Sequence, residues 1–135
     1  MILRPAIPTD LPAIAEIQAA CPEASQWNPP DYFNYNCWVA EKDRLCGFIV
    51  TRPTAPGESE LLNLAVAPDC RRGGVGRALL DAAMEAAPGA WFLEVRESNA
   101  GAIRLYENAG FRVCGKRPAY YSDPCEAGIV MSREK

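Results

Sequence analysis

Residues 62–111 read LNLAVAPDCRRGGVGRALLDAAMEAAPGAWFLEVRESNAGAIRLYENAGF, and this stretch decides the fold. It begins with an apolar run, residues 63–68, closed by a proline, which is typical of a strand covered on both faces. A second apolar run, Trp91–Val95, lies between two segments of helical pattern. We therefore expect a strand, a helix, a second strand and a second helix, with a glycine-rich turn opening the first helix.

The turn before the first helix, Arg71–Gly76, is rich in glycine. Three glycines within four residues let the backbone turn tightly and direct successive N–H groups toward one point. The helix that starts near Val75 adds its own free N–H groups and the positive end of its dipole. The sequence therefore predicts an anion site, and phosphate is the anion that such a turn most often binds.

Two nucleotide-binding motifs are disfavoured for this turn. A P-loop needs Lys followed by Ser or Thr after its last glycine, but Arg77 and Ala78 stand there. A dinucleotide fingerprint needs G-x-G-x-x-G, and a third glycine is missing at that spacing.

The turn does match another phosphate-binding loop. Its Arg71-x-x-Gly74-x-Gly76 pattern resembles the pyrophosphate loop of the GNAT acetyltransferase superfamily, written Gln/Arg-x-x-Gly-x-Gly/Ala. The flanks are similar as well, with LAV-x-P before the loop and LEVRESNAGAIRLYENAGF, residues 93–111, after it. The second run resembles the ribosomal-protein-alanine N-acetyltransferase (RimI-type) branch, and the resemblance is weaker outside residues 62–111.

The resemblance implies one GNAT domain over residues 1–135, of the α/β (α+β) class. Its sheet is expected to be mixed and mostly antiparallel, with roughly six to seven strands and about four flanking helices. The fourth and fifth strands are expected to splay apart and to hold the cofactor arm in the gap.

The remaining elements come from the flanking sequence. We expect strands at Ile2–Ile7, Cys37–Ala40, Leu45–Thr51, Phe111–Gly115 and Gly128–Met131, and helices starting near Thr9 and spanning Pro30–Tyr35. Prolines predict a mobile connection at Arg52–Glu58 and a turn-rich segment at residues 116–124.

Composition restricts the compartment and the partners. The six cysteines form no C-x-x-C pair and no zinc spacing, so we expect reduced thiols in the cytoplasm, with no disulfide and no metal. No apolar run reaches the ~18 residues of a membrane span, so no membrane contact is expected. The net charge is −3 without a basic tract, which argues against nucleic acid as a ligand.

The chain contains no histidine. A general base must therefore be a carboxylate, a tyrosinate, a thiolate, a neutral lysine or a water molecule. Histidine-based catalytic triads and facial iron sites are excluded.

Glu94 is an acid inside an otherwise apolar strand. One interpretation places it at an edge where the carboxylate reaches water. The other makes it a general base, because partial burial raises the pKa of a glutamate toward the working pH. The resemblance implies the second, since the glutamate of Leu-Glu-Val-Arg is the proton acceptor in that family.

Tyr106 lies on the helical stripe that faces the core, together with Ala102, Leu105 and Ala109. It is either a packed aromatic with a hydrogen-bonded hydroxyl or the acid that protonates the leaving thiolate of coenzyme A. The resemblance implies the acid.

The resemblance also implies acetyl-CoA as the acyl donor. The pantetheine arm is expected along a strand, with an N–H polarising the thioester carbonyl, and the pyrophosphate in the glycine loop. The residues expected to contact acetyl-CoA are Leu64, Ala65, Val66, Arg72, Gly73, Gly74, Val75, Gly76, Arg77 and Asn99. Ser98 and Asn99 are also plain N-cap candidates, and Arg71 and Arg72 are either phosphate contacts or solvated charges.

The acceptor side is marked by aromatic residues. Trp27, Tyr120 and Tyr121 are expected to flank the acceptor entrance, or alternatively to pack the end of the sheet. Two departures from the RimI-type pattern, the helix stop at Pro88-Gly89 and the pair Glu126-Ala127, weaken the case for a ribosomal-protein substrate.

The predicted function is an N-acetyltransferase in which the amine attacks the thioester directly, because nothing marks Cys114 or Cys125 as activated. Freeing an α-amino group, pKa ~7.7–8.0, costs well under about 1 kcal/mol near pH ~7.5, and freeing a lysine at ~10.4 costs about 4 kcal/mol under the same conditions. This favours the N-terminal amine of a protein, such as a ribosomal protein, with the enzyme a monomer or homodimer. The alternatives are a small amine acceptor, such as a polyamine or aminoglycoside, and a non-enzymatic acyl-CoA-binding module; the presence of both Glu94 and Tyr106 disfavours the module.

Overall fold

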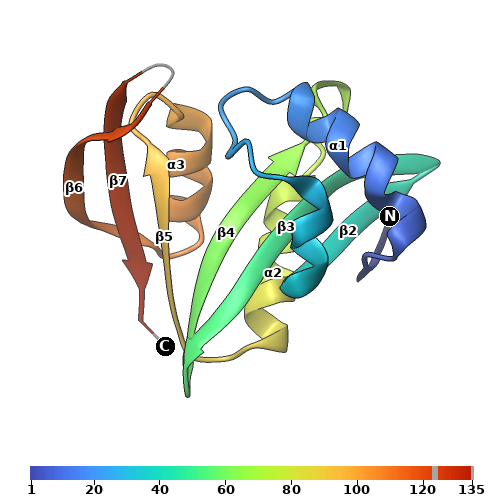
Figure 1. Ribbon diagram of the computed structural model, residues 1–135. Coiled ribbons are helices and arrows are strands. Elements are labelled where there is room, and N and C mark those ends of the chain that lie inside the picture. Colours follow the sequence, from blue (N-terminus) through green and yellow to red (C-terminus); the bar gives the residue numbers. More distant parts are fainter. Residues whose placement is uncertain (123–124, 135) are drawn as a thin grey trace.

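The alternation of apolar residues builds one mixed sheet. A computed structural model describes residues 1–122 and 125–134, and within them seven strands follow the order β1-β2-β3-β4-β5-β7-β6 (Figure 1). The strands are β1 (Ile2–Pro5), β2 (Asn36–Lys42), β3 (Arg44–Ala55), β4 (Glu58–Val66), β5 (Ala90–Arg96), β6 (Arg112–Tyr121) and β7 (Glu126–Arg133). Neighbouring strands are antiparallel except β4 and β5, which are parallel, so the predicted mixed, mostly antiparallel sheet is confirmed.

Helices cover both faces of this sheet. In the described residues they are the α-helices α1 (Leu11–Ala19), α2 (Val75–Ala86) and α3 (Ala100–Asn108) and the 3-10 helices η1 (Pro8–Asp10), η2 (Pro29–Asn34) and η3 (Pro68–Cys70). Figure 1 shows α1 on the near face, with α2 behind the sheet. One core packs α1 and η2 on β2 and β3 through residues such as Ile14, Tyr32 and Phe48, and the other packs α2 and α3 around Leu79 and Trp91.

The predicted splay between the fourth and fifth strands is also confirmed. β4 pairs with β5 only from Glu58↔Ala90 to Leu61↔Leu93, and beyond that point β5 pairs with β7 alone. Figure 1 shows the two strands close together at one end and apart at the other. The two ends that separate are residues 62–66 and 94–96. Buried and partly buried residues alternate in both segments, so the expected burial of both faces of the strand at residues 63–68 is wrong. Residues 63–66 still pair with β3 and residues 94–96 with β7, but one face of each segment is only partly covered.

The connection expected at Arg52–Glu58 is wrong, because β3 runs to Ala55 and β4 starts at Glu58. The pairing of β3 with β2 ends at Thr51, so Pro53 faces an open edge where its missing N–H costs no ladder hydrogen bond. Thr54 donates to Glu58 across the two-residue turn.

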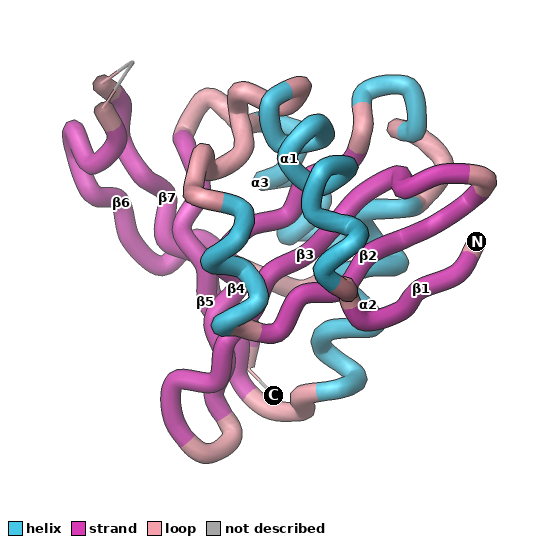
Figure 2. The backbone as a smooth tube through the Cα atoms, turned by 45° about the vertical axis from the view of Figure 1, so that its right-hand side comes forward, coloured by secondary structure: helices cyan, strands magenta, loops and turns pink. Residues whose placement is uncertain are grey.

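The turn-rich segment expected at residues 116–124 is also largely strand, because β6 continues to Tyr121. β6 is the edge strand of the sheet, at the opposite end from β1 (Figure 2), and an edge tolerates Pro118. Residues 123–124 of that prediction lie outside the described residues. No helix within the described ranges is long and apolar enough to cross a membrane.

Candidate active site

A cleft of about 510 Å³ opens where β4, the start of α2 and α3 meet. The splay produces it, because no strand covers the free end of β4. Nine of the ten residues predicted to contact acetyl-CoA line the cleft, namely Leu64, Ala65, Val66, Arg72, Gly74, Val75, Gly76, Arg77 and Asn99. Gly73 is not among its lining residues.

The glycine loop has the backbone of an anion cradle. Arg72 and Gly74 both adopt left-handed conformations, with φ of 71° and 77°. Gly74 is the N-cap of α2 and offers no side-chain cap, so the first N–H groups of the helix remain available to a ligand. This arrangement suits a diphosphate. A Cβ at Gly76 would lie 3.4 Å from Leu105 and 3.5 Å from Val66, in ordinary van der Waals contact, so the space around it does not require glycine.

Replacing Gly74 by valine is expected to weaken acetyl-CoA binding by at least about tenfold, because a β-branched residue is strained by roughly 1–2 kcal/mol or more at positive φ. The measurement is the acetyl-CoA-induced thermal shift or calorimetric titration. Gly57→Val is the matched control: Gly57 has a φ of 72° and open space around its Cβ position, but lies in the β3–β4 turn away from the cleft. Equal acetyl-CoA affinity in both variants would contradict the binding of acetyl-CoA by the glycine loop.

The structure separates the two arginines that open the loop. Arg71 donates to the Glu23 carboxylate at 2.6 Å and to the Val66 carbonyl at 3.3 Å, so it ties the loop to residues near Cys21. Within residues 1–122 and 125–134, Arg72 makes no ion pair and no side-chain hydrogen bond. Arg72 is therefore a cation that is available to a phosphate.

Strand alternation selects the N–H that faces the cleft. The Ala67 N–H donates to Cys46 of β3, so the N–H groups of Leu64 and Val66 turn the other way, toward the gap. The Leu64 N–H is taken by the side chain of Asn63, at 3.0 Å. Val66 is thus the better placed of the two to meet a carbonyl.

A buried polar network fixes the segment Cys21–Asn28 beside the cleft. Asn63 donates to the Ser25 carbonyl and to the Tyr32 hydroxyl, both at 2.9 Å, and accepts from the Ser25 N–H at 3.3 Å. Tyr32 in turn donates to Gln18, whose amide donates to the Trp27 carbonyl at 2.6 Å. Sequence reasoning missed Asn63 because a polar residue in an apolar strand shows its partners only in three dimensions.

Asn63→Ala is expected to destabilise the fold by about 1–3 kcal/mol, because it removes the hydrogen bonds of a buried amide to the Tyr32 hydroxyl and to the Ser25 backbone. The melting temperature should fall by about 5–10 °C. Asn36→Ala, at an exposed position of β2, is the control and should leave it within about 2 °C. Equal melting temperatures for the two variants would show that the network contributes little.

A second, smaller pocket of about 30 Å³ adjoins the cleft, with room for a water molecule. Glu94 and Tyr106 both line it, so the structure brings the two predicted catalytic residues together. Tyr106 and Asn99 line the cleft as well, and therefore mark where the two spaces meet.

Glu94 lies on the less buried face of β5, and its side chain is 19% exposed. Burial raises its pKa, Arg117 opposes that rise and Glu60 adds to it. The Arg117 Nε lies 3.2 Å from Oε2, yet this oxygen is buried and accepts no hydrogen bond from the described residues. Arg117 therefore acts on this oxygen through its charge and not through a directed hydrogen bond.

Tyr106 is almost fully buried and packs against Phe111, with ring centroids 5.8 Å apart. Burial, with a smaller contribution from Tyr121, raises the pKa of its phenol well above the usual value. The hydroxyl makes no hydrogen bond to the described part of the chain. Tyr106 is therefore protonated over the working pH range and has an unused donor.

The three aromatics expected at the acceptor entrance are not equivalent. Tyr121 lines the small pocket, where burial raises its pKa to about 12. Tyr120 packs edge-on against it at 5.0 Å but remains 47% exposed. The ring centroid of Trp27 lies 6.5 Å from that of Tyr32, and Trp27 lines neither the small pocket nor the cleft.

The capping of α3 corrects one sequence-based interpretation. Asn99 is the N-cap and accepts from the Ala102 N–H at 3.2 Å, whereas Ser98 donates to Glu126 at 3.0 Å. The Glu126 carboxylate also accepts from Arg96 at 3.0 Å, and this ion pair lowers its pKa. Glu126 therefore joins the end of β5 to the start of α3, a contact that sequence reasoning missed.

Two further observations bear on the chemistry available to the site. The six cysteines are free thiols, with Cys21, Cys37 and Cys46 buried. Among the described residues, no cluster of three or more Cys, Asp or Glu side chains is arranged to hold a metal ion.

The fold and the two joined pockets define an acyltransferase class, and comparison with known proteins gives the family. Residues 10–111 match the acetyltransferase (GNAT) family. The chain therefore belongs to the acetyltransferase (GNAT) family.

Its relatives carry related activities. It is 35% identical over 136 residues to the ribosomal protein bS18-alanine N-acetyltransferase of Escherichia coli (strain K12), covering 92% of this chain and 90% of that protein. A crystal structure of the Escherichia coli ribosomal-protein-S18-alanine N-acetyltransferase matches with a TM-score of 0.83 and 31% identity, covering 98% of this chain and 92% of that one. An N-alpha-acetyltransferase of Sulfurisphaera tokodaii is 34% identical over 150 residues, covering 92% of this chain and 87% of that protein.

An uncharacterized protein of Mycobacterium leprae is 42% identical over 107 residues, and the match covers 75% of this chain but 30% of that longer protein. The predicted membership of the GNAT superfamily, with similarity to the ribosomal-protein-alanine branch, is confirmed. The prediction of an N-acetyltransferase is confirmed as well.

Proposed function

We propose that this enzyme transfers the acetyl group of acetyl-CoA to the N-terminal α-amino group of a protein, such as a ribosomal protein. One observation carries the proposal: a diphosphate-sized cradle and a pocket holding a buried carboxylate and a buried phenol open into each other at Tyr106. Two relatives of similar length are named for protein N-terminal acetylation, which agrees with this acceptor.

The residues of the cleft fit acetyl-CoA. The left-handed Arg72 and Gly74 and the uncapped start of α2 match a diphosphate, and the space beside Leu64–Val66 matches an extended pantetheine arm. Acetyl-CoA supplies the activated acyl carbon when bound. The Val66 N–H is the group proposed to polarise the thioester carbonyl.

Glu94 is proposed as the general base. The amine nitrogen bonds to the acyl carbon, and its surplus proton passes to the Glu94 carboxylate, directly or through a water molecule in the small pocket. Burial makes Glu94 a stronger base than an ordinary glutamate, which suits an α-amino group better than a lysine.

Tyr106 is proposed as the acid. As the carbon–sulfur bond breaks, its hydroxyl donates a hydrogen bond and then its proton to the departing sulfur. Its raised pKa makes it a weak acid, so it acts late, once charge has developed on the sulfur.

We also propose that the protein acts in the cytoplasm, as a single domain over residues 1–135 and as a monomer or homodimer. The free cysteines agree with a reducing cytoplasm. One sheet carries both halves of the site, which agrees with a single domain.

A panel of acceptors tests the proposal. Thiol release from acetyl-CoA is measured with peptides that begin with Ala or Ser, with N-terminally blocked lysine peptides, and with polyamines and aminoglycosides. We expect turnover with free N-termini at least about tenfold above the blocked peptides at pH 7.5. Turnover with small amines alone would refute the protein N-terminus as acceptor and establish the small-amine alternative.

A further inference from the structure

A gap in β7 lets Glu94 reach across to the edge strand. Gly128 of β7 pairs with Arg96 of β5 on one side and with Arg117 of β6 on the other. A Cβ at Gly128 would lie 2.7 Å from Glu94 Oε2, a distance that real Cβ atoms do not tolerate. A side chain at position 128 would therefore force the Glu94 carboxylate to shift.

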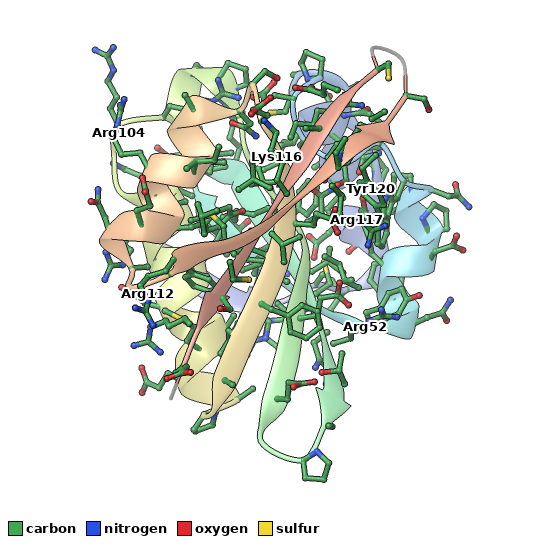
Figure 3. The ribbon with its side chains drawn as sticks, turned by 90° about the vertical axis from the view of Figure 1, so that its left-hand side faces the viewer. Arg52, Arg104, Arg112, Lys116, Arg117 and Tyr120 are labelled. Carbon is green, nitrogen blue, oxygen red and sulfur yellow. The ribbon has the colours of Figure 1, made fainter. Side chains whose placement is uncertain are left out.

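Arg117 stands on the far side of that gap. Its Nε lies 3.2 Å from Glu94 Oε2, and its guanidinium carbon lies 3.9 Å above the centre of the Tyr120 ring. Figure 3 shows Arg117 and Tyr120 together on the same part of β6. The arginine side chain is 56% exposed, so it reaches the shielded carboxylate from the solvent side.

A bulge in β6 sets up this geometry. The register passes from Arg117↔Gly128 to Tyr121↔Glu126, so β6 has two residues more than β7 over this interval. The bulge lies between Arg117 and Tyr121 and includes Ala119, which has a φ of 54°. Bulges re-aim the side chains that flank them, and this one places Tyr120 beneath the Arg117 guanidinium.

We propose that Arg117 is a positioning residue for the base. Its guanidinium stacks on Tyr120 and, through the gap left by Gly128, holds the Glu94 carboxylate in place and in its charged form. The catalytic role of Arg117 rests on the proposed function, in which Glu94 is the base. Its contacts with Glu94 and Tyr120 and the gap at Gly128 are independent of that function.

The charges around Glu94 agree with this role. Arg117 faces it from β6, together with the phenol of Tyr121, and Glu60 faces it from β4. Arg96, on its own strand, is paired with Glu126. Removing the Arg117 charge would leave burial and the repulsion from Glu60, both of which favour the protonated and inactive carboxyl group.

Arg117→Gln tests the inference, with Lys116→Gln as the matched control. Lys116 is the neighbouring cation on β6 and pairs with Glu97 at 2.7 Å, away from the pocket. The ratio of kcat/KM at pH 8 to that at pH 6 is expected to rise about fivefold to tenfold in Arg117→Gln and to stay unchanged in Lys116→Gln. The acetyl-CoA thermal shift should match wild type in both variants. Equal ratios in the two variants would overturn the inference.

Two more variants separate charge from bulk. Arg117→Lys keeps the charge and should hold the ratio of kcat/KM at pH 8 to that at pH 6 within about twofold of wild type. A ratio as high as that of Arg117→Gln would show that the positive charge at position 117 is not what matters. Gly128→Ala should displace the Glu94 carboxylate and lower kcat about tenfold, with acetyl-CoA binding retained. A wild-type kcat in this variant would show that the space left by Gly128 is not needed to position Glu94.

A titration independent of turnover distinguishes failure of this inference from failure of the proposed function. Carboxyl carbon NMR follows Glu94, assigned by Glu94→Gln, in wild type and in Arg117→Gln. The titration should move to higher pH in Arg117→Gln alone, whether or not any acceptor is turned over. Absence of wild-type turnover with every amine would refute the proposed function, while an unmoved Glu94 titration would refute the role of Arg117.

Discussion

Tyr106→Phe is expected to lower kcat by about 100-fold or more while leaving the fold and the acetyl-CoA affinity intact. The substitution removes one oxygen and keeps the ring that packs against Phe111. Because the hydroxyl makes no hydrogen bond to the described part of the chain, its removal leaves no buried partner unsatisfied. The decrease in kcat therefore measures the contribution of the hydroxyl to the proposed protonation of the leaving sulfur.

The measurement is kcat at saturating acetyl-CoA and acceptor, together with the melting temperature. Tyr35→Phe, at an exposed tyrosine outside both pockets, is the control and should retain wild-type kcat. Wild-type turnover in Tyr106→Phe would reduce Tyr106 to a packing residue.

Glu94→Gln is expected to lower kcat/KM by about 100-fold near pH 7.5 and to abolish the acidic limb of the pH profile. The base must be deprotonated to work, so the wild-type rate falls as the pH drops through the pKa of Glu94. Burial raises that pKa, which places the limb at higher pH than for an ordinary glutamate. A glutamine of the same shape does not titrate, and its residual rate should be flat across this range.

The variant should be at least as stable as wild type at neutral pH. It replaces a buried carboxylate oxygen that accepts no hydrogen bond from the described residues, although it also loses the ion pair with Arg117. Glu97→Gln is the control, since Glu97 is exposed and pairs with Lys116. A pH profile that keeps its acidic limb in Glu94→Gln would assign the base to another group.

The strand–turn–helix order around Leu62–Phe111 was predictable because its signals are local. The period of the apolar residues and the glycines of the loop depend on neighbours within a few positions. The same holds for the placing of Glu94 and Tyr106 on consecutive elements, which puts both side chains on one pocket.

Contacts between distant residues could not be read from the sequence. Arg71 meets Glu23, 48 positions away, and Asn63 meets Ser25, 38 positions away. The pairing of Arg117 with Glu94 depends on the register of β6, in which Arg117 lies opposite Gly128. The two mispredicted segments, Arg52–Glu58 and residues 116–124, failed for a related reason: proline suggests a loop unless an edge strand is known to be available.

The β6 bulge also has a consequence for association between molecules. An edge strand exposes unpaired N–H and C=O groups, which invite pairing with another chain and lead to aggregation. Pro118 removes one donor, the bulge twists the edge, and Lys116 and Arg117 place positive charges beside it. The opposite edge strand, β1, carries Arg4 and Pro5. The segment proposed to steady the base thus also discourages β6 from joining the sheet of a second molecule.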